Sequence, residues 1–258
     1  MTTADLDCFL RTDIITDGAR MQRIAEALQA LGFAPRVPYF LFEKTVAYGG
    51  SPHTIAVDLL APDVGPEHDD LMHRRDPRRI RPRNYRTLHG RRTPEAITIE
   101  RGTTRVDVSQ WGSGVFAAIP HPVSFVLMKL FAFRDRLASD DPAMHADAGY
   151  HAFDVFQVIA SMNAEEWDEG VAILREVSTH SVLAKARKIV ATQFMTSGAP
   201  GPVRIATYAR ERAGVQVSAE QVRRVVGDLV ELLADQASTL VVEKLRVLEP
   251  PRNRDRSK

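Results

Sequence analysis

The chain has 258 residues, of which 44% are hydrophobic and 26% are charged, the usual balance of a folded globular protein. This composition excludes a wholly disordered or fibrous chain, and the lone cysteine, Cys8, excludes a fold held by internal disulfides. The N-terminus is acidic where a secretory signal needs bases, and Lys129 interrupts the longest apolar run, 123–133, well short of the roughly 20 residues of a membrane span. We therefore expect a soluble, cytoplasmic protein with no membrane partner.

The N-terminal half has the pattern of a small mixed sheet with one helix. Asp17 is placed to cap a helix whose apolar stripe ends before Gly32. The pair Gly49-Gly50 marks a hairpin turn. Alternating apolar residues predict strands over 4–11, 37–46, 54–60, 96–100 and 104–108.

The C-terminal half reads as a series of helices. Two of them open on capping boxes, Asn163 with Glu166 and Ser218 with Gln221. Further helices are expected over 123–137, 148–162, 182–194 and 203–212. The sequence thus predicts an α+β fold with an α/β domain over 1–118, a helical domain over 119–247 and a disordered basic tail over 248–258.

Three carboxylates of the N-terminal half are candidate metal ligands. Asp5 and Asp7 share one face of a strand, and Asp58 lies among apolar residues in another strand. If the strands are neighbours, the three acids converge and suit one or two Mg²⁺ ions, as phosphoryl or nucleotidyl transfer requires. The alternative is a solvent-exposed acidic pair together with a salt-bridged Asp58.

Lys129 stands in a helix that is apolar on almost every side, and Arg136 follows on the same face. On the next helix, Asp154 also has apolar neighbours. Two explanations stay open. Lys129 and Asp154 form a structural ion pair between packed helices, or Lys129 reaches a nucleotide phosphate and Asp154 orients it.

Positive charge gathers in residues 73–92, which hold nine arginines and one acid, Asp76. The segment carries a charge of +8 and, because the whole chain carries +1, the other residues carry −7. This separation is typical of a surface that binds nucleic-acid phosphates, although an exposed loop that only aids solubility would look the same. The candidate RNA-binding residues are Arg74, Arg75, Arg78, Arg79, Arg81 and Arg83.

Three segments together resemble the AbiEii/MenT-type nucleotidyltransferase-like toxins of type IV toxin–antitoxin systems. The first is Thr3-Ala4-Asp5-Leu6-Asp7 with the helix end at 27–33, and the second is the strand around Asp58. The third runs from Ile119-Pro120-His121-Pro122 through the segment around Lys129 to Arg136 and Asp154. The resemblance covers roughly residues 1–160, and the remaining residues match only as a helical extension.

The resemblance implies a nucleotidyltransferase-like sheet and transfer of a nucleotide from an NTP to an RNA 3′ end, with tRNA as acceptor. It implies that Asp5, Asp7 and Asp58 hold Mg²⁺ and that Lys129 and Arg136 contact the triphosphate. Asp154 then positions Lys129 or assists the hydroxyl nucleophile. A toxic effect through blocked translation and a cognate antitoxin as partner belong to the same implication.

The chain departs from the family pattern at its start. The family has a Gly-[Gly/Ser] turn that opens a phosphate-binding helix before the D-x-D acids, and here Met1 comes just before them. We expect either an N-terminally truncated chain or a shortened family member. Two alternatives to RNA transfer therefore stay open, namely a non-catalytic protein that binds nucleic acid or a partner, and AMPylation of a protein.

Overall fold

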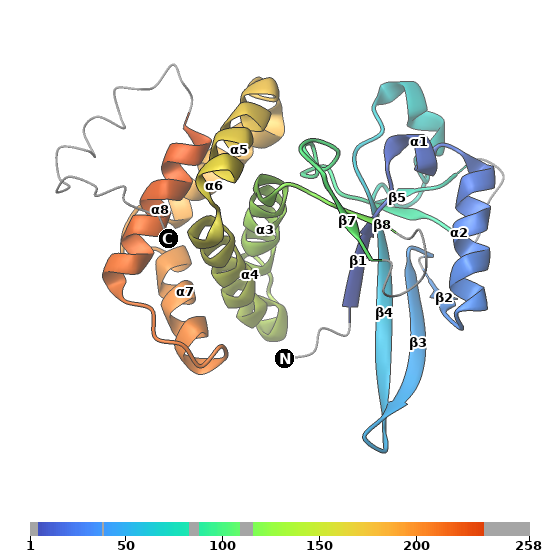
Figure 1. Ribbon diagram of the computed structural model, residues 1–258, viewed down its shortest axis with the longest axis horizontal. Helices are drawn as coiled ribbons and strands as arrows, with labels where there is room; N and C mark the ends of the chain where they lie inside the picture. The colour runs from blue at the N-terminus through green and yellow to red at the C-terminus, as the bar shows by residue number, and fades with distance from the viewer. Residues whose placement is uncertain (1–4, 38, 83–87, 109–115, 235–258) are drawn as a thin grey trace. The chain divides into compact units, whose positions relative to one another are not determined.

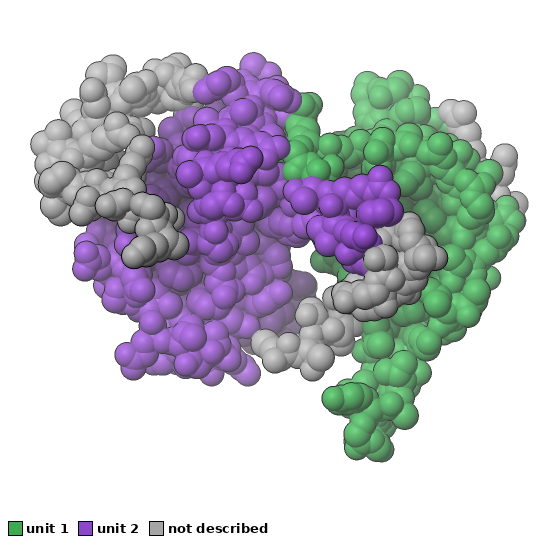
Figure 2. All heavy atoms as spheres, in the orientation of Figure 1, with its two compact units in different colours: residues 1–103 green, residues 104–258 purple. Residues whose placement is uncertain are grey.

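The computed structural model describes residues 5–37, 39–82, 88–108 and 116–234. The fold is α+β, and the chain divides into two compact units, residues 1–103 and 104–258, each with its own secondary structure (Figure 2). The sequence placed the boundary after residue 118, so the hairpin over 104–119 belongs to the second unit rather than the first. The expected tail over 248–258 lies outside the described residues.

The first unit is built on a mixed sheet in the order β2-β3-β4-β6-β5, with β1 paired to β4 (Figure 1). Strands β1 and β6 run parallel to β4, whereas the β2–β3, β3–β4 and β5–β6 pairs are antiparallel. The strands are β1 Asp5–Phe9, β2 Ala34–Arg36, β3 Leu41–Tyr48, β4 Ser51–Ala61, β5 Arg79–Ile80 and β6 Gly90–Arg92. The long β3–β4 hairpin turns at Gly49-Gly50, as predicted, with a positive φ at both glycines.

One face of this sheet is covered by α2, Gly18–Ala30, which follows the short helix α1, Thr12–Ile15. Asp17 caps α2, as predicted, by accepting hydrogen bonds from the N–H groups of Ala19 and Arg20. A 3-10 turn, η1 Pro66–Leu71, follows β4. The core under α2 includes Met21, Ala25, Phe42, Val57, Leu59 and Ala61. Odd-numbered residues of β4 therefore face α2, and even-numbered residues face the other side of the sheet.

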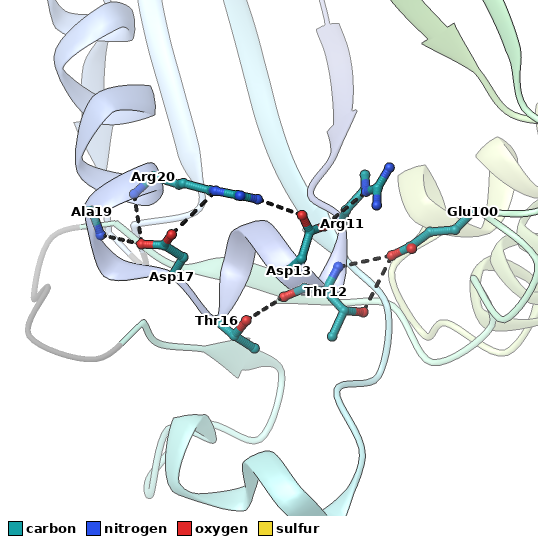
Figure 3. A network of polar contacts seen from close by, with 8 residues as sticks. All are labelled: Arg11, Thr12, Asp13, Thr16, Asp17, Ala19, Arg20 and Glu100. Atoms are coloured by element: carbon teal, nitrogen blue, oxygen red, sulfur yellow. Dashed lines mark hydrogen bonds and ion pairs between the residues drawn. The ribbon is translucent and has the colours of Figure 1, made fainter.

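A polar network ties α1 and the start of α2 to the end of this unit (Figure 3). The backbone N–H of Thr12 donates to the carboxylate of Glu100 over 3.0 Å. Asp13 accepts from Arg20 over 2.6 Å and from Arg11 over 3.0 Å. Because these ion pairs are exposed, each contributes about 0.2–1 kcal/mol or less. The network orients the two helices more than it stabilises the unit.

Two strand predictions differ from the structure. Residues 96–100 form consecutive turns, because the N–H groups of Ala96 and Ile99 donate to the carbonyls of Thr93 and Ala96. These local hydrogen bonds replace the strand pairing that the β-branched residues suggested. The strand expected over 37–46 begins at Leu41, since the chain turns after β2 and Tyr39 takes a φ of +75°.

The second unit consists of a hairpin followed by packed helices. Both predicted capping boxes are present, at Asn163–Glu166 and Ser218–Gln221. The elements are β7 Thr104–Asp107, β8 Phe116–Ile119, α3 Pro122–Leu137, α4 Pro142–Ser161, α5 Ala164–Glu176, α6 Ser181–Gln193, α7 Pro200–Glu211 and α8 Ala219–Leu233. Within the described part of the chain, no helix is long and apolar enough to cross a membrane.

Helix α4 is longer than predicted and lies at the centre of the second unit's packing. It begins at Pro142 rather than at residue 148, because the Asp141 side chain accepts from the N–H of Ala143 and caps the first turn. It packs against α3, α7 and α8. The contact between α3 and α4 carries the charged residues that the sequence singled out.

Candidate functional site

The two strands that carry the candidate acids are neighbours, as the predicted convergence of those acids requires. Strands β1 and β4 pair in parallel, with Asp7 directly beside Asp58 and Asp5 beside Ala56. Asp7 and Asp58 lie on the sheet face away from α2, because their neighbours Cys8, Val57 and Leu59 pack on the α2 side. Two carboxylates therefore stand next to each other on one face. The side chain of Asp5 lies outside the described atoms.

A basic group also reaches this face. Arg91 of β6 places its guanidinium 3.9 Å from a carboxylate oxygen of Asp58. The Arg91 side chain is 53% exposed and that of Asp58 is 26% exposed. The distance is that of a loose ion pair rather than a hydrogen bond. The salt-bridged Asp58 that the sequence left open as an alternative thus has a partner, one that the sequence had not identified.

The Asp7–Asp58 pair has the donor chemistry that Mg²⁺ requires. Mg²⁺ is held in proteins by one or two carboxylates, with water and substrate phosphates completing its octahedral shell. Among the side chains that the structure describes, no group of three or more His, Cys, Asp or Glu gathers as a metal cluster. Asp7 and Asp58 would supply two carboxylate ligands, with water and a substrate phosphate taking the other positions around Mg²⁺.

In the second unit, Lys129 of α3 and Asp154 of α4 form the ion pair that the sequence anticipated. The ammonium lies 2.5 Å from the carboxylate, and the two side chains are 26% and 17% exposed. The same ammonium lies 4.7 Å from the ring centroid of Tyr150. Tyr150 precedes Asp154 by one helical turn, so both project from the same face of α4. Lys129 is held by an anion and an aromatic ring.

This environment keeps Lys129 charged. Burial alone would lower the pKa of its ammonium, but the hydrogen bond to Asp154 and the charge of that carboxylate outweigh burial and raise the pKa. A lysine with a raised pKa does not act as a base near neutral pH. It can hold an anion such as a phosphate.

Two further basic residues lie along the same helix contact. Arg136 comes seven residues after Lys129 on α3 and donates a hydrogen bond to the sulfur of Met144 on α4. Half-buried His151 lies on α4 between Met144 and Asp154. Burial, and then the positive charges of Lys129 and Arg136, lower the pKa of His151 from 6.5 to about 4. His151 is therefore neutral at pH 7.

The arginine segment is anchored to the first unit through β5, β6 and the buried side chain of Ile80. Asp76 pairs with Arg78 over 3.0 Å and with Arg79 over 3.2 Å. Arg78 is nevertheless exposed, as are Arg74, Arg75 and Arg81, for which no ion pair with a described acid is seen. Arg83 lies outside the described residues. The exposed arginines are the ones best placed to meet a phosphate backbone.

The candidate residues thus fall into two sets. Asp7 and Asp58 belong to the first unit, and Lys129, Asp154 and Arg136 to the second. The sequence reasoning missed Arg91, Tyr150 and His151. For Tyr150, the four-residue spacing to Asp154 was an available signal.

Comparison of the chain with protein-family models, curated proteins and solved structures finds no match.

Proposed function

We propose that the protein is a Mg²⁺-dependent nucleotidyltransferase that transfers a nucleotide from an NTP to the 3′ end of an RNA, with tRNA as acceptor. The observation that carries the proposal is the pairing of Asp7 with Asp58 on adjacent parallel strands. Two neighbouring carboxylates repel each other, and the ion pair of Asp58 with Arg91, at 3.9 Å, is a loose one. A metal that bridges protein and phosphate would remove that repulsion.

Each set of residues has a task in this proposal. Asp7 and Asp58, with Asp5 beside them on β1, would hold Mg²⁺, which when bound stabilises charge on the attacking and leaving oxygens. Lys129 and Arg136 would hold the triphosphate. Asp154 already accepts from Lys129 over 2.5 Å, which favours the positioning role for Asp154 over a role as the base.

RNA binding is assigned to the exposed arginines of the first unit. Arg74, Arg75 and Arg81 would neutralise backbone phosphates and release counterions. Arg78 and Arg79 would contribute less because both pair with the carboxylate of Asp76, which offsets part of their charge. A cytoplasmic toxin that blocks translation, restrained by an antitoxin, is the biological setting that the resemblance suggests.

A second candidate is a protein that keeps the fold and binds nucleic acid without catalysis. The observation that favours it is that the charges are matched within the chain. Arg91 lies near Asp58, and Asp154 neutralises Lys129. Internal pairing of this kind stabilises a fold without any substrate.

The deciding experiment is transfer of α-³²P label from each NTP to total RNA with Mg²⁺, using the wild-type chain and Asp7→Asn. Asp7 is exposed, so the substitution leaves the fold intact. We expect labelled tRNA from the wild type and a loss of about 100-fold or more in the variant. Asp69→Asn, which removes an exposed carboxylate from η1, is the matched control and should retain activity.

The other outcomes separate the alternatives. Label on protein rather than RNA would indicate AMPylation. RNA binding without label from either chain, unchanged in Asp7→Asn, would support the non-catalytic candidate and contradict the transferase.

A further inference from the structure

The contact between α3 and α4 places three basic side chains along one line. Lys129 meets Asp154, and seven residues later Arg136 meets Met144, so the two helices run antiparallel. Seven residues span about 10.5 Å along a helix. His151 lies between Met144 and Asp154 on α4, one turn from Asp154, and so stands between the two cations of α3.

The charged and titratable groups around His151 come from three helices. From α3 they are Lys129 and Arg136. Within α4 they are Asp154, one turn ahead of His151, Asp147, one turn before it, and Tyr150, whose ring centroid lies 5.2 Å from that of His151.

Helix α7, which packs against α4, adds Tyr208 at 6.0 Å from Tyr150, centroid to centroid, and Arg204, which lies 2.8 Å from His145. Burial, with the nearby charge of Asp154, raises the pKa of Tyr208, so this phenol stays neutral. Asp147 is exposed and Arg204 is engaged with His145. Helix α8 also packs on α4, and of all these charged groups only Lys129 and Arg136, both cations, shift the pKa of His151.

His151 itself is poised to respond to an anion. Its Nδ1 is enclosed and has no hydrogen-bond partner in the described part of the chain. Burial, and then the positive charges of Lys129 and Arg136, hold the ring neutral and lower its pKa to about 4. A multiply charged anion between Lys129 and Arg136 would reverse the sign of the local field and favour the imidazolium.

We propose that Lys129, Arg136 and His151 form a binding site for a phosphate-bearing anion, and that His151 takes up a proton when the anion binds and becomes its third cationic ligand. The proton comes from solvent, the neutral ring becomes an imidazolium, and its new N–H donates to a phosphate oxygen. The inference rests on the proposed function for the natural occupant, the triphosphate of an NTP.

The test uses pyrophosphate without Mg²⁺ and the full chain with ¹³C-labelled histidine. The His151 resonance is followed by NMR from pH 3.5 to 8.5 with and without saturating pyrophosphate, and calorimetry in two buffers of different ionisation enthalpy counts the protons taken up. We expect the His151 midpoint to move from about 4 to about 7 on binding. By linkage, binding should then be about tenfold tighter at pH 6 than at pH 8.

The variant His151→Gln should bind pyrophosphate at pH 8 and lose this tenfold gain. His145→Gln, on the same helix but engaged with Arg204, should keep it. Comparing the variants also removes the contribution of pyrophosphate's own titration. ATP and adenosine identify the source of the affinity, since ATP should reproduce the shift and adenosine should not.

A His151 midpoint that stays near 4 with saturating pyrophosphate, absence of binding, or an unchanged pH dependence in His151→Gln would overturn the inference. The measurement needs neither Mg²⁺ nor the carboxylates of the first unit. Proton-coupled binding of pyrophosphate without any label transfer would therefore support this site and contradict the proposed function. Label transfer without a shift of the His151 midpoint would support the proposed function and contradict this site.

Discussion

The two sets of candidate residues differ in how far the protein has already balanced their charges. On the sheet of the first unit, Asp7 and Asp58 are neighbouring like charges, with Asp7 exposed, Asp58 partly exposed and Arg91 at 3.9 Å from Asp58. Between α3 and α4 of the second unit, Lys129 and Asp154 are opposite charges in direct contact at 2.5 Å and largely enclosed. The two carboxylates would gain from an added cation, whereas the charges of Lys129 and Asp154 already balance each other.

This contrast separates stability from function. An enclosed ion pair that loses one partner leaves a charge that water solvates poorly, so its members contribute to folding whether or not a substrate binds. Neighbouring carboxylates with one exposed member, such as Asp7 beside Asp58, contribute little to folding. A functional role is therefore easier to isolate by substitution in the first unit than in the second.

The largest effect is expected from substituting Lys129 of the second unit, and it should appear in the rate of nucleotide transfer. Lys129→Met should lower nucleotide transfer by about 100-fold or more, because the triphosphate loses its main cationic ligand. Lys185→Met, which removes an exposed lysine from α6, should leave transfer unchanged. Initial rates at several NTP concentrations measure the effect. Equal rates for both variants would reduce Lys129 to a structural residue.

The difference between the enclosed ion pair and the neighbouring carboxylates can be tested by measuring the free energy of unfolding. Asp154→Asn should lower the free energy of unfolding by about 1–3 kcal/mol, because the Lys129 ammonium remains enclosed without its carboxylate. Asp58→Asn should change it by less than about 1 kcal/mol, since the repulsion from Asp7 is relieved while the loose ion pair with Arg91 is lost. Denaturant titration of both variants gives the comparison. A larger loss for Asp58→Asn would reverse our assignment of the two regions.

Local signals explain what the sequence could predict of these regions. Helix starts could be predicted at Asp17, Asn163 and Ser218, because an N-cap depends only on residues within one turn. The strand predicted over 96–100 was wrong because its β-branched residues are equally compatible with turns that bond locally. Strand alternation gave the shared face of Asp7, whereas its pairing with Asp58 required the register of β1 on β4.

Charge environments could be predicted only where both partners stood out from apolar surroundings. Lys129 and Asp154 did so, and their ion pair followed. His151 carries no such mark, because its low pKa arises from burial and from cations on another helix. Arg91 was one arginine among nine in its segment, and only the β4–β6 pairing brings it toward Asp58.

Acid sensitivity should originate in the second unit. The pKa of His151 is about 4 in the folded chain and near 6.5 when unfolded. Below pH 6.5 the unfolded chain binds a proton that the folded chain does not, so stability is full above 6.5 and falls as the pH decreases toward 4. The slope for one such group is at most about 1.4 kcal/mol per pH unit.

Unfolding titrations at several pH values would show this slope in the wild type and a shallower one in His151→Gln. His145→Gln should behave as the wild type does. Identical slopes for the wild type and His151→Gln would mean that another group controls the acid response.

The smallest effects are expected on RNA binding by the first unit. There, we expect each arginine to contribute according to whether an acid of the same unit already pairs with it. Replacing Arg74 or Arg75 by Ala should reduce the slope of log Kd against log salt by about one per lost phosphate contact, measured with labelled tRNA between about 50 and 200 mM salt. Arg78→Ala should reduce it less, because Arg78 donates to Asp76 over 3.0 Å and its charge is already matched. If all three variants change the slope equally, the pairing with Asp76 does not survive contact with RNA, and the whole segment acts as one basic surface. If only the Arg74 and Arg75 variants change the slope, the arginines that contact RNA are those without an acidic partner in the described part of the unit. Charge balance within the chain would then separate binding residues from structural ones in both units.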